Sequence, residues 1–215
     1  MRRAPLLLAA ALAFPRLLPA QDGSAVIQRA AAAYQGLSAF RANFVQVIDD
    51  PMIGRFDSRG VLAQSGSARL AMRFSDPAGE AIIMDGRYIW LYTPSTAPGQ
   101  VIRSPVPENP GFGPNVLGWI LDRPAARYHI TEARSDTLGG RTMDVVTLTP
   151  SDWTLPFSEA VVWLDRADAL PRRLEVIERS GARRILTFSD VRSNPRVDSK
   201  TFAFEVPAGV RVVEQ

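Results

Sequence analysis

Apolar residues near the start of the chain recur with the period of a helix. Between Ser24 and Gln35 they fall on one helical face, and Gly36 is a typical helix stop. Ser24 has the side chain of an N-cap residue, so the pattern predicts a helix over 24–35. Its apolar face contains Val26, Ile27, Ala30, Ala33, Tyr34 and Leu37.

From Ser38 the period changes to two, which is typical of strands with one buried face. Phe40–Phe44 and Leu70–Phe74 alternate strictly. Turn pairs such as Asp85-Gly86 and Ser180-Gly181 separate the strand-like runs. The pattern therefore predicts a mainly β protein in which a single antiparallel sheet is flanked by helices. The further runs are 60–64, 80–84, 88–92, 100–103, 127–132, 143–149, 160–164, 173–178, 184–188 and 202–205.

One segment interrupts the series of strands. Residues 104–115 are rich in Pro, Gly and Asn, and 116–121 form a short apolar run between Pro114 and Pro124. That run predicts a short apolar helix that serves as a lid or a plug for the sheet.

The first twenty residues have the features of an export signal. Arg2 and Arg3 precede an apolar run over Leu6–Phe14, and Ala20 offers a small residue before a cut at Gln21. We expect 1–20 to be a cleaved signal peptide and 21–215 to be one exported, soluble domain. An apolar run of nine residues is too short to span a bilayer.

Composition argues against several classes of function. The chain has no Cys and a single His, His129, so thiol chemistry and His-rich metal sites are excluded. Beyond residue 20 basic and acidic residues are equal in number, which argues against a nucleic-acid partner. No nucleophile elbow, phosphate-binding loop or zinc-protease motif occurs. We therefore expect a protein that is not an enzyme and needs no metal or cofactor.

What remains is apolar surface, and periodicity leaves two uses for it open. The apolar residues either fill a closed core or line a ligand cavity in a sheet that curls without closing.

The segment Asp85–Pro94, DGRYIWLYTP, resembles the DG-x-x-hydrophobic-W-x-Y-x-P hairpin of the LolA family of periplasmic lipoprotein carriers. Two other segments fit in order. Phe44-Val45-Gln46 resembles the F-x-Q end of the family's first strand, and 202–210 resembles its closing F-x-F-x-x-P-x-G-V segment. The likeness covers 24–213.

The resemblance implies an unclosed, strongly curved sheet of about eleven strands, with helices over the open mouth. It also implies a periplasmic carrier, which we expect to be a monomer. Its partners are acylated lipoproteins, an inner-membrane ABC transporter that supplies them and an outer-membrane receptor that takes them. A carrier is needed because one C16 chain exposed to water costs roughly 12 kcal/mol, at about 0.8 kcal/mol per methylene.

The resemblance also suggests which residues face the cargo. Strand parity leaves Trp90 free to lie on either face of the sheet. The cavity-lining residues expected are Phe40, Leu70, Met72, Phe74, Trp90 and Tyr92, and the lid residues are Val116, Leu117, Trp119 and Ile120.

One position departs from the family pattern. Counting from Gly60 to Gly86, Gly66 stands where the family carries an Arg that ties the sheet to the lid. Arg69 is the nearest basic residue, and its odd spacing from Gly66 predicts that it faces the other way. The connection between sheet and lid that this Arg makes in the family is therefore either lost here or made by another group. Other readings are a binding protein or sensor for another amphiphile, a secreted hydrolase, and a closed β core with a protein-binding edge.

Overall fold

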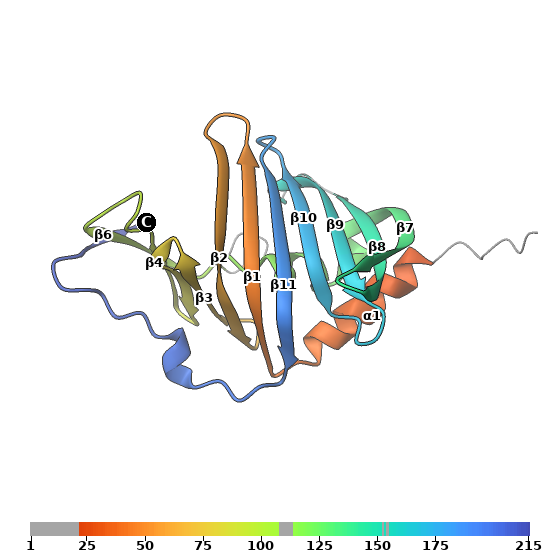
Figure 1. Ribbon diagram of the computed structural model, residues 1–215, viewed down its shortest axis with the longest axis horizontal. Coiled ribbons are helices and arrows are strands. Elements are labelled where there is room, and N and C mark those ends of the chain that lie inside the picture. Colours follow the sequence, from red (N-terminus) through yellow and green to blue (C-terminus); the bar gives the residue numbers. More distant parts are fainter. Residues whose placement is uncertain (1–21, 108–113, 152, 154) are drawn as a thin grey trace, which may run out of the picture.

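Twelve strands form one sheet in the computed structural model, which describes residues 22–107, 114–151, 153 and 155–215. Eleven of them pair antiparallel, and the twelfth joins an edge in parallel. The order across the sheet is β12-β6-β5-β4-β3-β2-β1-β11-β10-β9-β8-β7. The sheet curves away on both sides of the long central strands, and its edge strands β7 and β12 are not neighbours (Figure 1). This confirms the unclosed, mainly antiparallel sheet expected from the sequence.

The strands are bounded as follows: β1 Ala39–Asp50, β2 Gly54–Ser65, β3 Arg69–Asp76, β4 Ala78–Asp85, β5 Tyr88–Tyr92, β6 Gln100–Pro105, β7 Tyr128–Leu138, β8 Arg141–Pro150, β9 Phe157–Asp165, β10 Pro171–Glu178, β11 Arg183–Ser193 and β12 Arg211–Glu214. The helices are α1 Gly23–Gln35, α2 Val116–Leu121, α3 Pro124–Arg127 and the 3-10 turn η2 Ser199–Phe202. The predicted helix over 116–121 is confirmed. The strand predicted over 127–132 begins at Tyr128 because α3 precedes it.

Helix α1 begins one residue earlier than predicted. Asp22, not Ser24, is the N-cap, and its carboxylate accepts hydrogen bonds from the Ser24 and Ala25 amides at 3.0 and 3.3 Å. Gly23 lies so close to β7 that a Cβ there would be 2.7 Å from Ile130 Cγ2. On the same side of the molecule, Arg29 pairs with the buried Asp144 of β8 at 2.7 Å. These contacts fix α1 against one end of the sheet.

The predicted strand over Phe202–Glu205 is wrong. Residues 199–202 form η2, and 203–207 run on as an extended segment without a strand partner. Phe202 and Phe204 alternate because they pack down onto the outer face of the sheet, and not because they pair at its edge. Arg73 of β3 holds this segment by donating to the carbonyl oxygens of Thr201 and Ala203 at 3.3 and 3.1 Å. The true last strand, β12, follows it.

The sheet separates two apolar faces. Residues of one cross-strand row, Gln64, Leu70, Met84 and Ile89, lie on the inner face with α1 and α2. The adjacent row, Ala63, Ala71, Ile83 and Trp90, lies on the outer face and is covered by Phe202 and Phe204. Small residues in the outer row leave room for the two phenylalanines.

The Asp85-Gly86 turn explains why its sequence pattern extends to a tryptophan. The Asp85 carboxylate accepts hydrogen bonds from the Arg87 and Tyr88 amides and, at 2.8 Å, from the Trp90 indole. Burial raises the pKa of Asp85, but these hydrogen bonds more than offset that effect and leave the pKa below its ordinary value. The motif is therefore a turn that fixes Trp90 on the outer face.

Gly60 has no side chain, and two aromatic rings from the neighbouring strands fill the space that this leaves on the inner face. It is paired with Phe44 on one side and with Phe74 on the other. Because Gly60 has no side chain, the two rings meet edge to face across it, with centroids 5.1 Å apart. A Cβ at Gly60 would overlap the Arg73 carbonyl oxygen and lie 2.8 Å from Phe74 Cα.

We predict that Gly60→Ala lowers the free energy of unfolding by about 3 kcal/mol, because the backbone of β3 would have to move. Arg59→Ala is the matched control, since its ion pair with Asp76 is solvent-exposed and contributes at most about 1 kcal/mol. Urea unfolding of both variants measures the difference. Equal losses would contradict the close approach of β2 and β3.

Candidate functional site

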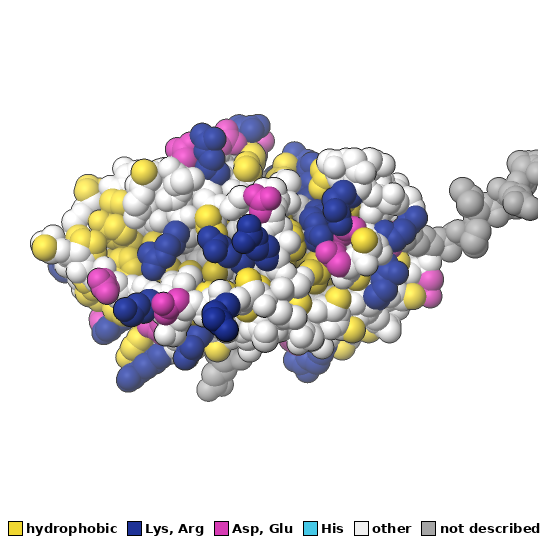
Figure 2. Space-filling view, turned by 60° about the horizontal axis from the view of Figure 1, so that its bottom comes forward, with side chains coloured by type: hydrophobic (Ala, Val, Ile, Leu, Met, Phe, Trp, Pro, Cys, Tyr) yellow, Lys and Arg dark blue, Asp and Glu magenta, His cyan; other side chains and the backbone are white. Residues whose placement is uncertain are grey.

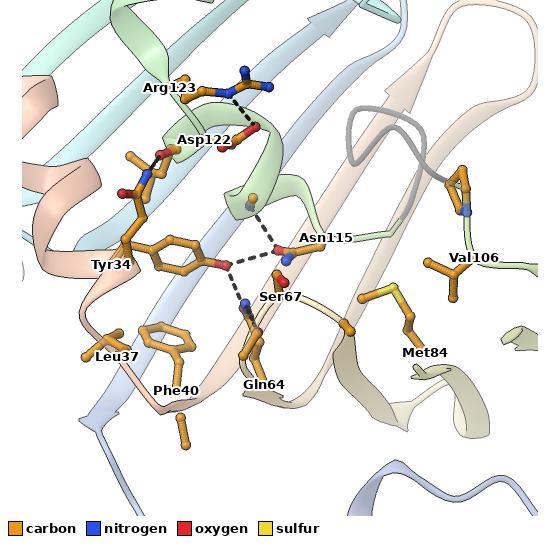
Figure 3. A pocket seen from close by; sticks show the side chains of 17 residues that line it. Tyr34, Leu37, Phe40, Gln64, Ser67, Met84, Val106, Asn115, Asp122 and Arg123 are labelled. Atoms are coloured by element: carbon orange, nitrogen blue, oxygen red, sulfur yellow. Dashed lines mark hydrogen bonds and ion pairs between the residues drawn. The ribbon is translucent and has the colours of Figure 1, made fainter. Parts of the chain in front are cut away.

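A cavity of about 640 Å³ lies where the end of α1, the β2–β3 turn and α2 approach one another (Figure 3). Its apolar wall comes from both the sheet and the helices, whereas its rim toward α3 carries Asp122 and Arg123. The volume falls in the range of about 300–1,000 Å³ that is typical of ligand pockets. The lining residues are Tyr34, Gln35, Leu37, Ala39, Phe40, Gln64, Gly66, Ser67, Ala68, Met84, Val106, Pro107, Asn115, Gly118, Leu121, Asp122 and Arg123.

Three buried polar side chains connect the sheet to α2 on one wall of the cavity. The Tyr34 hydroxyl of α1 lies 2.6 Å from Gln64 Oε1 of β2 and 3.2 Å from Asn115 Oδ1 (Figure 3). Asn115 is the N-cap of α2, and its Oδ1 also accepts from the Gly118 amide at 2.9 Å. We call Tyr34, Gln64 and Asn115 the polar latch.

The Tyr34 hydroxyl has only one proton to donate to the two acceptors of the latch. Gln64 uses its Nε2 to donate to the Gly66 carbonyl, and Asn115 Oδ1 caps α2, so both side chains present oxygens to Tyr34. A tyrosine hydroxyl donates only one hydrogen bond, and the shorter distance assigns it mainly to Gln64. The bond to the sheet is therefore the stronger one and the bond to α2 the weaker.

Burial of the latch changes the acidity of Tyr34. Desolvation raises its pKa to about 12, and the hydrogen bonds to Asn115 and Gln64 oppose the shift only in part. Tyr34 is thus a neutral donor throughout the physiological pH range.

Comparison with known proteins identifies the family of this chain. The family model described as outer membrane lipoprotein carrier protein LolA matches residues 35–205. The chain belongs to the LolA family. An outer-membrane lipoprotein carrier protein of Pseudomonas aeruginosa is 26% identical over 218 residues, covering 100% of both chains. Its counterpart in Chromohalobacter salexigens is 24% identical over 212 residues, covering 98% of this chain and 96% of the relative.

A solved structure gives the same fold. An uncharacterized conserved protein from Thermus thermophilus superposes with a TM-score of 0.55 at 12% identity, covering 91% of this chain and all of that one. The LolA family is one of carriers and not of enzymes, which confirms the prediction of a non-enzymatic lipoprotein carrier.

The LolA-family arginine expected at position 66 has no direct replacement there. Gly66 adopts a φ of +59° in the β2–β3 turn, and its amide donates to the Ser38 carbonyl. Arg69 lies two residues before Ala71 on β3 and therefore on the same, outer face of the sheet, as its spacing predicted. The polar connection between sheet and α2 is made instead by the latch, two residues before Gly66.

The structure places the six expected cavity-lining residues in three groups. Phe40 lines the cavity. Leu70, Met72 and Phe74 lie on the inner face as part of the packed core below it. Trp90 and Tyr92 lie on the outer face, where Trp90 stacks on Phe204 with centroids 5.4 Å apart and Tyr92 tilts against the same ring at 5.6 Å. These last two residues are not brought to the cavity.

The four expected lid residues all lie on α2 over the inner face. Leu117 and Ile120 are buried, and Val116 packs beside them. Trp119 stacks on Phe157 of β9 with an angle of 7° between the rings. In the described part of the chain its indole N–H is buried and has no hydrogen-bond partner. A buried donor without an acceptor costs about 1–3 kcal/mol.

The latch was not predicted from the sequence, and of the 17 residues that line the cavity only Phe40 was among the expected site residues. Of the missed residues, Met84 could most readily have been predicted, because it pairs with Leu70 on the same face of the sheet. Gln64 is a polar residue on the buried face of a strand, and Asn115 directly precedes the apolar run of α2. Both patterns were present in the sequence, but only the fold brings them to Tyr34.

Other chemistries find no support in the described residues. They contain no group of three or more His, Cys, Asp or Glu side chains that could hold a metal ion. No described helix is long and apolar enough to cross a membrane. Arginines are dispersed over the face in Figure 2, with acidic side chains beside several of them, and form no continuous basic stripe there.

The latch predicts a specific loss of stability at high pH. The pKa of Tyr34 is about 12 in the folded protein and near 10 when the chain unfolds. The unfolded state therefore loses its proton first, and stability falls as pH rises through this window. Between pH 8 and pH 11 the expected loss from Tyr34 is about 1.4 kcal/mol.

Urea unfolding at both pH values tests this prediction, with Tyr34→Phe as the reference. The variant is expected to lack this component of the pH dependence. A wild-type loss no larger than that of Tyr34→Phe would show that Tyr34 is not a buried neutral donor.

Proposed function

We propose that this protein carries lipoproteins across the periplasm by holding their acyl chains between α2 and the inner face of the sheet. The observation that carries the proposal is the cavity of about 640 Å³ beside α2, in a chain of the LolA family. In this proposal an inner-membrane ABC transporter supplies the lipoprotein and an outer-membrane receptor accepts it. The protein acts as a monomer.

Export to the periplasm is part of the same proposal. Residues 1–20, which lie outside the described residues, serve as the cleaved signal peptide, and 21–215 form the carrier domain.

The cargo requires α2 to move. The acyl chains of a lipoprotein are together larger than the drug-sized ligands that cavities of this volume hold. The chains therefore enter by displacing α2 from the core it covers. The Trp119 N–H has no partner to lose when α2 lifts, and the bond of the latch to α2 is the weaker of the two. The acyl chains then take the place of the core against the buried Leu117 and Ile120.

The cargo-facing surface then consists of the cavity and the core exposed by lifting α2. Phe40 contributes from the cavity, and Leu70, Met72 and Phe74 from the inner face of the sheet. The lid contributes four side chains, Val116, Leu117, Trp119 and Ile120. Trp90 and Tyr92 are left out of this surface, since they lie against Phe204.

We predict that Leu37→Asp and Val106→Asp each weaken binding of a dipalmitoylated lipopeptide about tenfold or more, because acyl chains would bury an unpaired charge. Both residues line the cavity and are half-buried, so the variants are expected to fold. Val45→Asp is the matched control: Val45 is 52% exposed and faces away from the cavity. Binding is measured by native mass spectrometry and by fluorescence titration. No lipopeptide uptake by the folded wild-type protein would reject the carrier proposal.

A second prediction concerns the latch. The closed position of α2 and the cargo exclude each other, so weakening the closed state raises the apparent affinity for the lipopeptide. Only the weaker hydrogen bond joins Tyr34 to α2, so Tyr34→Phe removes at most about 1 kcal/mol of closure and is expected to tighten lipopeptide binding by up to about fivefold. The same titration measures it. Weaker binding by Tyr34→Phe would mean that Tyr34 holds the cargo and not the lid.

A further inference from the structure

Large hydrophobic side chains are exposed at one end of the molecule, far from the cavity. Met52 and Ile53, at the turn between β1 and β2, are 90% and 70% exposed. Phe56 follows on β2, and Trp153 of the β8–β9 loop is 84% exposed. The β1–β2 hairpin stands out beyond the rest of the sheet in Figure 1. Strand β1 separates this end from Phe40 by ten residues, or roughly 33 Å.

Contacts between three loops show that these side chains belong to one surface. A Cβ placed on Gly181, in the β10–β11 turn, would lie 3.6 Å from Pro51 of the β1–β2 turn. Two residues before Gly181, Arg179 donates to the Leu155 carbonyl at 3.0 Å and lies over the Trp153 ring at 4.1 Å. We call Met52, Ile53, Phe56 and Trp153 the apolar tip.

The apolar side chains of the β1–β2 turn have no role in holding the fold. Hairpin turns are normally polar, and exposed Met and Ile gain nothing from folding. The turn itself is held by Asp50, whose carboxylate accepts from the Met52 and Ile53 amides at 2.8 and 3.2 Å. These amides are therefore satisfied without water, which lets the tip enter a less polar medium.

We propose that the apolar tip inserts into the interfacial region of a lipid bilayer. Shape favours a membrane over a protein: a stable protein interface buries about 800 Å² on each partner, which a narrow convex hairpin tip does not provide. Side-chain chemistry also favours a membrane. Tryptophan beside arginine is typical of the headgroup region, where the ring lies among acyl chains and the charge stays hydrated.

The charges around the tip limit the depth of insertion and predict how binding responds to salt. Arg55 pairs with Asp57 at 3.1 Å, and Arg184 pairs with Glu178 at the same distance. Asp49 and Asp50 end β1 just below the turn and stay at the level of the headgroups. Because basic and acidic groups alternate here, insertion depends on apolar contact and only weakly on anionic lipid.

The double variant Met52→Ser/Ile53→Ser tests the inference. The matched control, Val45→Ser/Val206→Ser, removes two other exposed apolar side chains, which are 52% and 38% exposed and lie away from the tip. Association of the cargo-free protein with vesicles of phosphatidylethanolamine and phosphatidylglycerol at 3:1 is measured by cosedimentation. The tip variant is expected to partition at least tenfold less than the wild type, whereas the control remains within twofold.

Two further readouts make the result decisive. Raising NaCl from 50 to 500 mM is expected to change wild-type partitioning less than twofold, and brominated lipids are expected to quench Trp153 fluorescence, read as the difference from Trp153→Phe. Equal partitioning of wild type and tip variant, or no wild-type partitioning, would overturn the proposal. So would a tip variant that binds vesicles normally but loses a protein partner.

The inference does not depend on the carrier role. The tip variant is expected to bind the dipalmitoylated lipopeptide as the wild type does, because the tip lies outside the cavity. Vesicle association without lipopeptide uptake would leave the tip proposal standing and remove the carrier proposal. Lipopeptide uptake without vesicle association would remove the tip proposal and leave the carrier proposal standing.

Discussion

The structure depends on the fact that its sheet bends strongly but does not close. A closed barrel covers its inner face with its own strands, whereas an open sheet leaves that face to other elements. Here the helices take this role, and they do so unequally. Helix α1 is fixed by the Gly23 approach to β7 and by the Arg29–Asp144 ion pair. Helix α2 has only six residues and is attached through side-chain contacts and the latch. The inner face therefore has one firmly held cover, α1, and a second, α2, that we propose is removable.

On its outer face the sheet is covered by a chain segment that several contacts hold in place. The row from Ala63 to Trp90 is covered by Phe202 and Phe204, and Arg73 ties this segment down through two carbonyl oxygens. At the edge, Arg103 of β6 pairs with Glu214 of β12, with 3.0 Å between Nε and Oε2. All of these groups find partners, in contrast to the Trp119 N–H on α2. These contacts thus hold the covering segment against the outer face, whereas we propose that α2 moves.

The sequence predicts most of the sheet because alternation identifies a half-buried strand from local information alone. It also predicts α2, since an apolar run between prolines has few other uses. It fails at Phe202–Glu205, where alternation arises from packing onto a face, a tertiary arrangement that period two does not distinguish from pairing. The site is harder to predict for the same reason. Tyr34, Gln64 and Asn115 lie on three elements, and no local pattern indicates that one hydroxyl proton serves two of them.

The pairing of β1 with β11 has a consequence for how the chain reaches this fold. These central neighbours join residues near position 40 to residues near position 190, so the middle of the sheet closes a loop of about 150 residues. A chain that emerges from its amino end has no partner for this side of β1 until almost all of it is available. Such long-range pairing is slow, and β1 with its exposed hydrogen-bonding edge waits during that time. Folding of this protein therefore requires nearly the whole chain. A chain truncated before β11 lacks the central pairing of the sheet and not merely its end.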